Sequence, residues 1–128
     1  MKKIVVLVVE DNSFMSDSIA DSIQYFFAER DIEVEVVKAT SLEEAIDCLT
    51  DDRHDLITLD GNLSHGHHGS DVLKKMSLKQ VSKTIIYSGE MGFVSDCYKN
   101  GIPAFLKSES FLDILPSIEN RIINQKNK

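Results

Sequence analysis

The chain has 128 residues, of which 14 are basic and 21 are acidic, so its net charge is -7. This length is typical of a single domain whose core is large enough to be stable without disulfides or a structural metal. The negative charge argues against direct binding to the phosphate backbone of DNA or RNA.

Two further features bear on the cellular setting. Cys48 and Cys97 stand far apart and outside any metal-ligand spacing, so we expect free, buried thiols in a reducing compartment. The apolar run near the amino terminus stops at Glu10 without a cleavage site, unlike a signal peptide. No other stretch approaches the roughly 20 apolar residues of a membrane helix. We therefore expect a cytoplasmic protein, with residues 1–128 forming one domain.

The first half of the chain alternates strand patterns with helix patterns. Residues 4–9 are a continuous β-branched and leucine run, typical of a strand buried on both faces. From Phe14, apolar residues recur three or four apart and predict a helix, with Asn12 or Ser13 as its cap. Residues 34–39 predict a second strand, and a capping box at residues 41–44 predicts the start of a second helix.

The second half continues this alternation with three shorter predicted strands, at residues 56–59, 84–87 and 104–106. A glycine and histidine loop over residues 61–69 precedes one short predicted helix that contains Val72, Leu73 and Met76. Residues 93–100 predict another short helix, closed by Gly101. The last helix is predicted over about residues 111–124, where Pro116 either bends it or marks a later start.

Five strands alternating with five helices predict a doubly wound α/β fold, in which helices cover both faces of a parallel sheet. Ligands of such sheets bind beyond the carboxyl ends of the strands. The residues that directly follow the strands are therefore the candidate site: Glu10, Asp11, Asp60, Ser88 and Lys107.

These side chains together favour phosphoryl transfer. Three carboxylates at one edge repel one another unless a divalent cation neutralises them, and Mg²⁺ accepts carboxylate, water and phosphate oxygens. Asp60 can then attack phosphorus, with Ser88, Lys107 and the backbone amides of residues 61–63 as donors to the phosphoryl oxygens. Each residue alone is equally typical of a helix cap, a turn or a solvated surface. Their combined order and spacing favour the site.

The remaining histidines allow two interpretations. Imidazoles are common transition-metal ligands, which makes His65, His67 and His68 candidates for such a site. The loop lacks a cysteine or carboxylate at ligand spacing, so a solvated connection is the favoured interpretation. His54 is interpreted as a turn residue before the third strand.

The sequence resembles a bacterial response-regulator receiver domain, of the single-domain chemotaxis type, over nearly its whole length. Residues 8–12 resemble the acidic pair of that family and residues 59–63 its phosphoacceptor motif. Residues 87–89 resemble its hydroxyl position, and residues 106–107 its lysine. The resemblance implies a flavodoxin-like strand order, 2-1-3-4-5.

The resemblance also implies a mechanism. A histidine kinase, a phosphotransfer protein or a small acyl phosphate would donate to Asp60, while Glu10, Asp11, Asp60 and the backbone carbonyl of Asn62 would hold Mg²⁺. Asn62 and Glu90 would influence hydrolysis. The protein would act as a switch between protein partners, with self-catalysed phosphorylation and dephosphorylation, rather than as an enzyme. It would be a monomer or a weak phosphorylation-dependent dimer.

Two rivals and three departures qualify this interpretation. A receiver-like module that never takes phosphate would bind a partner constitutively, and a phosphatase would require the Asp-x-Asp pair that the sequence lacks. Ser108 follows the lysine where the family has proline, and Phe105 lies two residues before the lysine rather than three. The loop at residues 64–69 has one extra residue and no proline. The chain is either a whole protein or one domain of a larger one.

Overall fold

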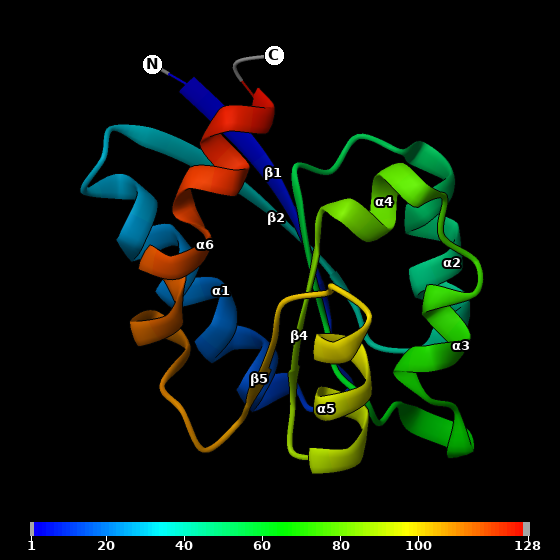
Figure 1. Cartoon of the computed structure of the whole chain (residues 1–128). Helices are drawn as coiled ribbons and strands as arrows, with labels where there is room; N and C mark the ends of the chain where they lie inside the picture. Colours follow the sequence, from blue (N-terminus) through cyan, green and yellow to red (C-terminus); the bar gives the residue numbers. More distant parts are fainter. Residues whose placement is uncertain (1, 127–128) are drawn as a thin grey trace.

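Five parallel strands form one sheet in the order β2-β1-β3-β4-β5, as predicted (Figure 1). The computed structural model describes residues 2–126, and the side chains of residues 2–120. The strands are β1 (Lys2–Val9), β2 (Ile32–Ala39), β3 (Leu56–Leu59), β4 (Thr84–Ser88) and β5 (Ala104–Leu106). The helices are α1 (Ser13–Ala28), α2 (Leu42–Asp51), α3 (Gly69–Leu73), α4 (Leu78–Ser82), α5 (Met91–Lys99) and α6 (Phe111–Lys126), with a 3₁₀ turn, η1 (Ser64–Gly66).

Strand β1 is an interior strand of the sheet and pairs with both β2 and β3. Its side chains alternate between two cores: Val6 and Val8 join one apolar cluster, and Leu7 and Val9 join the other. All four are essentially inaccessible to solvent. This double burial explains the uninterrupted apolar run that marks the strand in the sequence.

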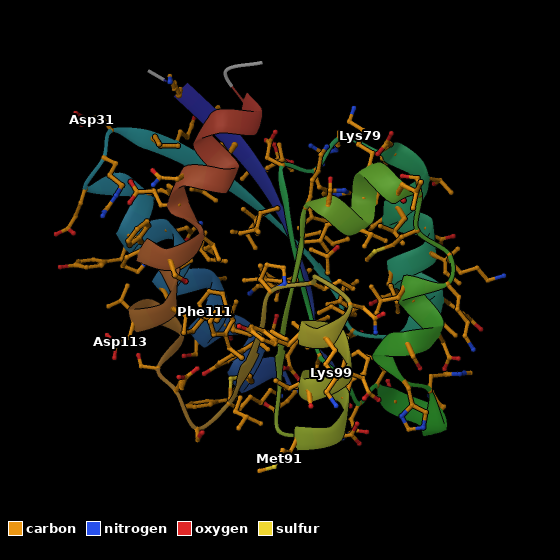
Figure 2. All side chains as sticks on the ribbon, in the orientation of Figure 1. Asp31, Lys79, Met91, Lys99, Phe111 and Asp113 are labelled. Atoms are coloured by element: carbon orange, nitrogen blue, oxygen red, sulfur yellow. The ribbon has the colours of Figure 1, made fainter. Side chains whose placement is uncertain are left out.

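The helices form two layers. Helices α1 and α6 cover one face of the sheet, and α2 to α5 cover the other (Figure 1). Phe111 lies at the start of α6 (Figure 2). Its ring contacts the ring of Tyr87 edge-on, with 5.0 Å between ring centroids. Arg30 stacks on Phe26 and pairs with Glu119, which links α1 to α6. No helix within residues 2–126 has the length and apolar content needed to cross a membrane.

Side-chain caps define where the first two helices begin. Asn12 is the cap of α1, because its Oδ1 accepts a hydrogen bond of 2.9 Å from the Met15 amide. Ser41 caps α2 by accepting from the Glu44 amide at 3.2 Å. The Glu44 carboxylate accepts from the amide of Thr40 rather than from that of Ser41, so the box is one residue wider than the usual pattern.

The crossover from β3 to β4 differs from the prediction, because it contains two short helices instead of one. The chain leaves α3 after Leu73, and Ser77 starts α4 with a capping box. Ser77 Oγ accepts from the Gln80 amide at 3.1 Å, and Gln80 Oε1 accepts from the Ser77 amide at 3.0 Å. This reciprocal pair satisfies two free amide groups and separates the helices.

Three smaller predictions can also be compared with the structure. Helix α6 runs through Pro116 without a break, so the prediction of a later start is wrong. Gly101 has a φ of +83°, the left-handed conformation expected after a helix end. Both cysteines are free thiols, but only Cys97 is fully buried, whereas Cys48 is partly exposed.

Candidate functional site

The carboxyl ends of four strands bring the predicted residues to one edge of the sheet. The backbone pairing continues past the strands: the Asp60 amide donates to the Val9 carbonyl at 3.1 Å, and the Lys107 amide donates to the Ser88 carbonyl at 2.9 Å. The residues that follow β1, β3 and β5 are therefore held by the same ladder as the strands.

Glu10, Asp11 and Asp60 form an acidic cluster. Each offers one carboxylate oxygen, and these oxygens all lie within 4.8 Å of one another. Glu10 and Asp60 are buried, with exposed fractions of 1% and 5%, while Asp11 is exposed at the mouth of the site. Such a set of hard oxygen donors, open on one side, is the kind that Mg²⁺ uses together with water and phosphate.

Lys107 is the basic member of the site. Its Nζ lies 2.8 Å from Glu10 Oε1 and 3.0 Å from Asp60 Oδ2, so one ammonium group faces both buried carboxylates. Burial acts to lower the pKa of Lys107, but its contacts with Glu10 and Asp60 outweigh burial and leave that pKa above its usual value. The side chain is therefore a fixed positive charge beside Asp60.

Glu10 is a buried carboxyl group in a cluster of three carboxylates, and one ammonium group, that of Lys107, faces it. Burial raises the pKa of Glu10 to about 7; Lys107 opposes this shift, and the charge of Asp60 adds to it. Glu10 Oε1 is buried and makes no aligned hydrogen bond, although Lys107 Nζ is close. A divalent cation would satisfy this oxygen and favour the ionised carboxyl, so the residues fit a Mg²⁺ site.

The Ser88 hydroxyl faces the residue after Asp60. Ser88 is fully buried, and its Oγ accepts a hydrogen bond of 3.1 Å from the Glu90 amide. A Cβ atom at Gly61 would lie only 2.7 Å from Ser88 Oγ and 2.8 Å from the ring of Phe93. The absence of a side chain at Gly61 therefore keeps open the space beside the Ser88 hydroxyl, next to Asp60.

A second glycine, Gly69, makes a close approach that sequence reasoning missed. A Cβ atom there would lie 2.3 Å from the Asp60 carbonyl oxygen, and its amide donates to the Gly61 carbonyl at 2.9 Å. The start of α3 thus packs directly on the backbone of Asp60. Phe93 was also missed as a site residue, because only the folded chain brings it beside Gly61. The positions of the two glycines, at either end of the loop, were the available signal.

The predicted cradle of backbone amides is smaller than expected. The Leu63 amide already donates to the His67 carbonyl at 2.9 Å, so of residues 61–63 only Gly61 and Asn62 are left as candidates. Asn62 is exposed and lies opposite His68 in an isolated antiparallel bridge, whose hydrogen bonds are made by the neighbouring residues. The carboxylate of Glu90 reaches back toward the site, because its Oε2 would lie 3.3 Å from a Cβ at Gly61.

The other flagged residues lie outside this site. His65, His67 and His68 are exposed, as expected of a solvated loop, whereas His54 is buried with an exposed fraction of 3%. Phe105 is partly buried and packs against the core. The peptide bond between Lys107 and Ser108 is trans.

Comparison with known proteins agrees with this geometry. The sequence profile of the response regulator receiver domain matches residues 6–113. No curated protein sequence matches significantly. Among solved structures, the response regulator domain of Thermotoga maritima CheB is similar, at 24% identity and a TM-score of 0.70, over 99% of this chain and 98% of that one. A CheY-like receiver domain protein from Methanospirillum hungatei gives 19% identity and a TM-score of 0.73, over 99% and 98%.

A third similar structure is NtrX from Brucella abortus, with 18% identity and a TM-score of 0.71. The match covers 99% of this chain but 28% of NtrX, so this chain spans about a quarter of that protein. These likenesses support the shared fold, and the profile match covers most of the chain. The chain therefore belongs to the response regulator receiver family of two-component signalling.

Proposed function

We propose that this chain, as one receiver domain, is a Mg²⁺-dependent phosphoacceptor switch in which Asp60 receives the phosphoryl group. One observation supports this most strongly: the buried Asp60 carboxylate lies beside two other carboxylates and 3.0 Å from the Nζ of Lys107. Glu10, Asp11, Asp60 and the Asn62 carbonyl would hold the ion. Bound Mg²⁺ would supply positive charge to the phosphoryl oxygens.

The residues of the chain have separate roles in this reaction. An Asp60 carboxylate oxygen forms a bond to phosphorus while the bond to the donor nitrogen or acyl oxygen breaks, and the donor keeps that electron pair. Lys107 offsets negative charge on the transferring group, and the Ser88 hydroxyl donates to one of its oxygens. The site thus acts mainly by positioning and by charge.

Release of the phosphoryl group involves the rim of the site. Water must reach phosphorus past the exposed Asn62 and the Glu90 side chain, which reaches toward Gly61. We therefore assign these two side chains the control of the phosphoryl lifetime, and the hydrolysis is the chain's own reaction.

We assign the surface that changes partners to α5, β5 and α6. A groove of about 490 Å³ lies between these elements and is lined by Tyr98, Ile102, Phe105 and Ile118, among others. When Ser88 moves toward the new phosphate, the Glu90 amide that donates to it moves with it, at the start of α5. Phosphorylation would thereby reshape this face for a downstream protein.

The test is phosphoryl uptake from a small acyl phosphate in Mg²⁺ buffer, followed by intact-protein mass spectrometry. We expect the wild-type chain to gain one phosphoryl group, and Asp60→Asn to gain none. The control Asp47→Asn, an exposed position on α2, should behave as wild type. Chelation of Mg²⁺ should abolish uptake by the wild-type chain.

Two results would contradict the proposal. Phosphoryl gain by Asp60→Asn would place the acceptor elsewhere. A wild-type chain that binds Mg²⁺ but never gains mass, from an acyl phosphate or from phosphorylated kinases, would favour the rival module that binds its partner constitutively.

A further inference from the structure

A second concave surface lies between the start of α2 and the histidine loop before α3. It encloses about 290 Å³ and is lined by Ser41, Leu42, Glu43, His65 and His67. Two imidazoles and one carboxylate, from segments more than 20 residues apart in the sequence, therefore border one hollow. None of the three takes part in the acidic site at the strand ends.

This combination of donors suits a particular class of ion. Two histidines and one glutamate, with a position left for water, are a common ligand set for Zn²⁺. Imidazole nitrogen favours zinc, copper and nickel, whereas Mg²⁺ prefers a shell of oxygen atoms. The hollow and the acidic site therefore differ in the ion that each would select.

The backbone holds the histidine loop against α2. Ser64 Oγ donates to the Thr40 carbonyl at 3.1 Å, which ties the η1 turn to the residues that precede α2. The His67 carbonyl accepts from the Leu63 amide, and this bond closes the turn on its other side. The two histidines thus have a fixed backbone position relative to Glu43.

Ion binding would require the three side chains to rotate, because their donor atoms do not converge in the structure. Among the described residues, the group whose donor atoms lie within 4.8 Å of one another is the acidic cluster of Glu10, Asp11 and Asp60. His65, His67 and Glu43 are all exposed, so their side chains can turn toward a common centre without disturbing the core. The adjacent Glu44 and the negative charge of the whole chain favour the approach of a cation.

We propose that His65, His67 and Glu43 form a binding site for a divalent transition-metal ion of the zinc class, separate from the Mg²⁺ site. His68 lies in the same loop but does not line the hollow. Substitution of His68 therefore distinguishes ion binding at this defined site from non-specific binding to a histidine-rich loop.

The experiment is calorimetric titration of the full chain, without a histidine tag, with ZnCl₂ in saturating Mg²⁺. We expect one Zn²⁺ per chain. Loss of a residue that only supports a ligand costs about 10- to 100-fold in metal affinity, so His65→Ala and His67→Ala should each cost at least about tenfold. Glu43→Gln should weaken binding in the same direction.

Two controls decide the origin of any binding. His68→Ala should keep an affinity within about threefold of wild type, and Asp60→Asn should still bind Zn²⁺ at full stoichiometry. Circular dichroism should confirm that every variant is folded. Equal losses from all three histidine variants would show non-specific imidazole binding and overturn the proposal. Loss of Zn²⁺ in Asp60→Asn would assign the ion to the acidic site and also overturn it.

Discussion

The hydroxyl of Tyr87 connects β4 to the segment that follows Lys107. Tyr87 is buried, and its hydroxyl donates to the Glu109 carbonyl at 2.5 Å, with the Lys107 carbonyl 3.5 Å away. Burial raises the pKa of this phenol above its usual value, so it remains a donor at neutral pH. The phenol therefore helps to hold the backbone next to Lys107.

We expect Tyr87→Phe to slow phosphoryl uptake several-fold, because Lys107 would be held less firmly beside Asp60. The lost hydrogen bond should also lower the free energy of unfolding by about 0.5–1.5 kcal/mol. Uptake should be measured well below the unfolding midpoint, where loss of stability does not change the folded fraction. The control is Tyr98→Phe, since Tyr98 is exposed. An unchanged uptake rate with lowered stability would show that Tyr87 acts only on the fold.

At the scale of elements, the short helix α4 depends on its cap and on one buried amide. Gln80 is buried, and its Nε2 donates to the Leu49 carbonyl at 2.8 Å and to Asp52 Oδ1 at 3.2 Å. The same side chain accepts from the Ser77 amide. One residue therefore joins the start of α4 to the end of α2.

Ser77→Ala should lower the free energy of unfolding by about 0.5–2 kcal/mol, because the Gln80 amide would lose its capping oxygen. Urea denaturation followed by circular dichroism would measure this change. Ser95→Ala, at an exposed position inside α5, removes a hydroxyl without removing a cap and should leave stability nearly unchanged. Equal effects from the two variants would contradict the role of the cap.

For the whole molecule, His54 makes stability depend on pH. Burial lowers the pKa of His54, and the positive charges of Arg53 and Lys83 act in the same direction, while Asp51 and Asp52 oppose them. In the unfolded chain the pKa of histidine is about 6.5, so the unfolded chain binds the proton more readily than the folded chain. Stability contributed by neutral His54 is present above that pH and is lost as the pH falls.

We therefore expect the free energy of unfolding of the wild-type chain to decrease more between pH 8 and about pH 5.5 than that of His54→Gln. Glu10 has the opposite dependence, since its raised pKa makes the folded state bind protons more readily. Both chains contain Glu10, so the difference between them isolates His54. The exposed His68→Gln serves as the control. Parallel pH curves for wild type and His54→Gln would contradict this assignment.

Residue order and hydrophobic periodicity were enough to predict the parallel sheet and the five residues at its edge, while the strand order followed from the family resemblance. A strand buried on both faces has to be apolar throughout, and the residues after parallel strands have to meet at one edge. Both constraints fix which residue types follow one another along the chain, so the sequence alone shows their effect. The division of the third crossover into α3 and α4 was missed, although Ser77 and Gln80 have the Ser-x-x-Gln spacing of a capping box, the same signal that predicted the helix start at residues 41–44.

Other features depend on contacts between distant segments. The placing of Phe93 against Gly61, the bond from Tyr87 to Glu109, the burial of His54 and the hollow shared by His67 and Glu43 follow from packing rather than from local pattern. The chain alone identifies which chemical groups lie at the ends of its strands. The distances between these groups, their burial and their charge balance each depend on several segments at once. They are therefore set only when the helices pack on the sheet and exclude water.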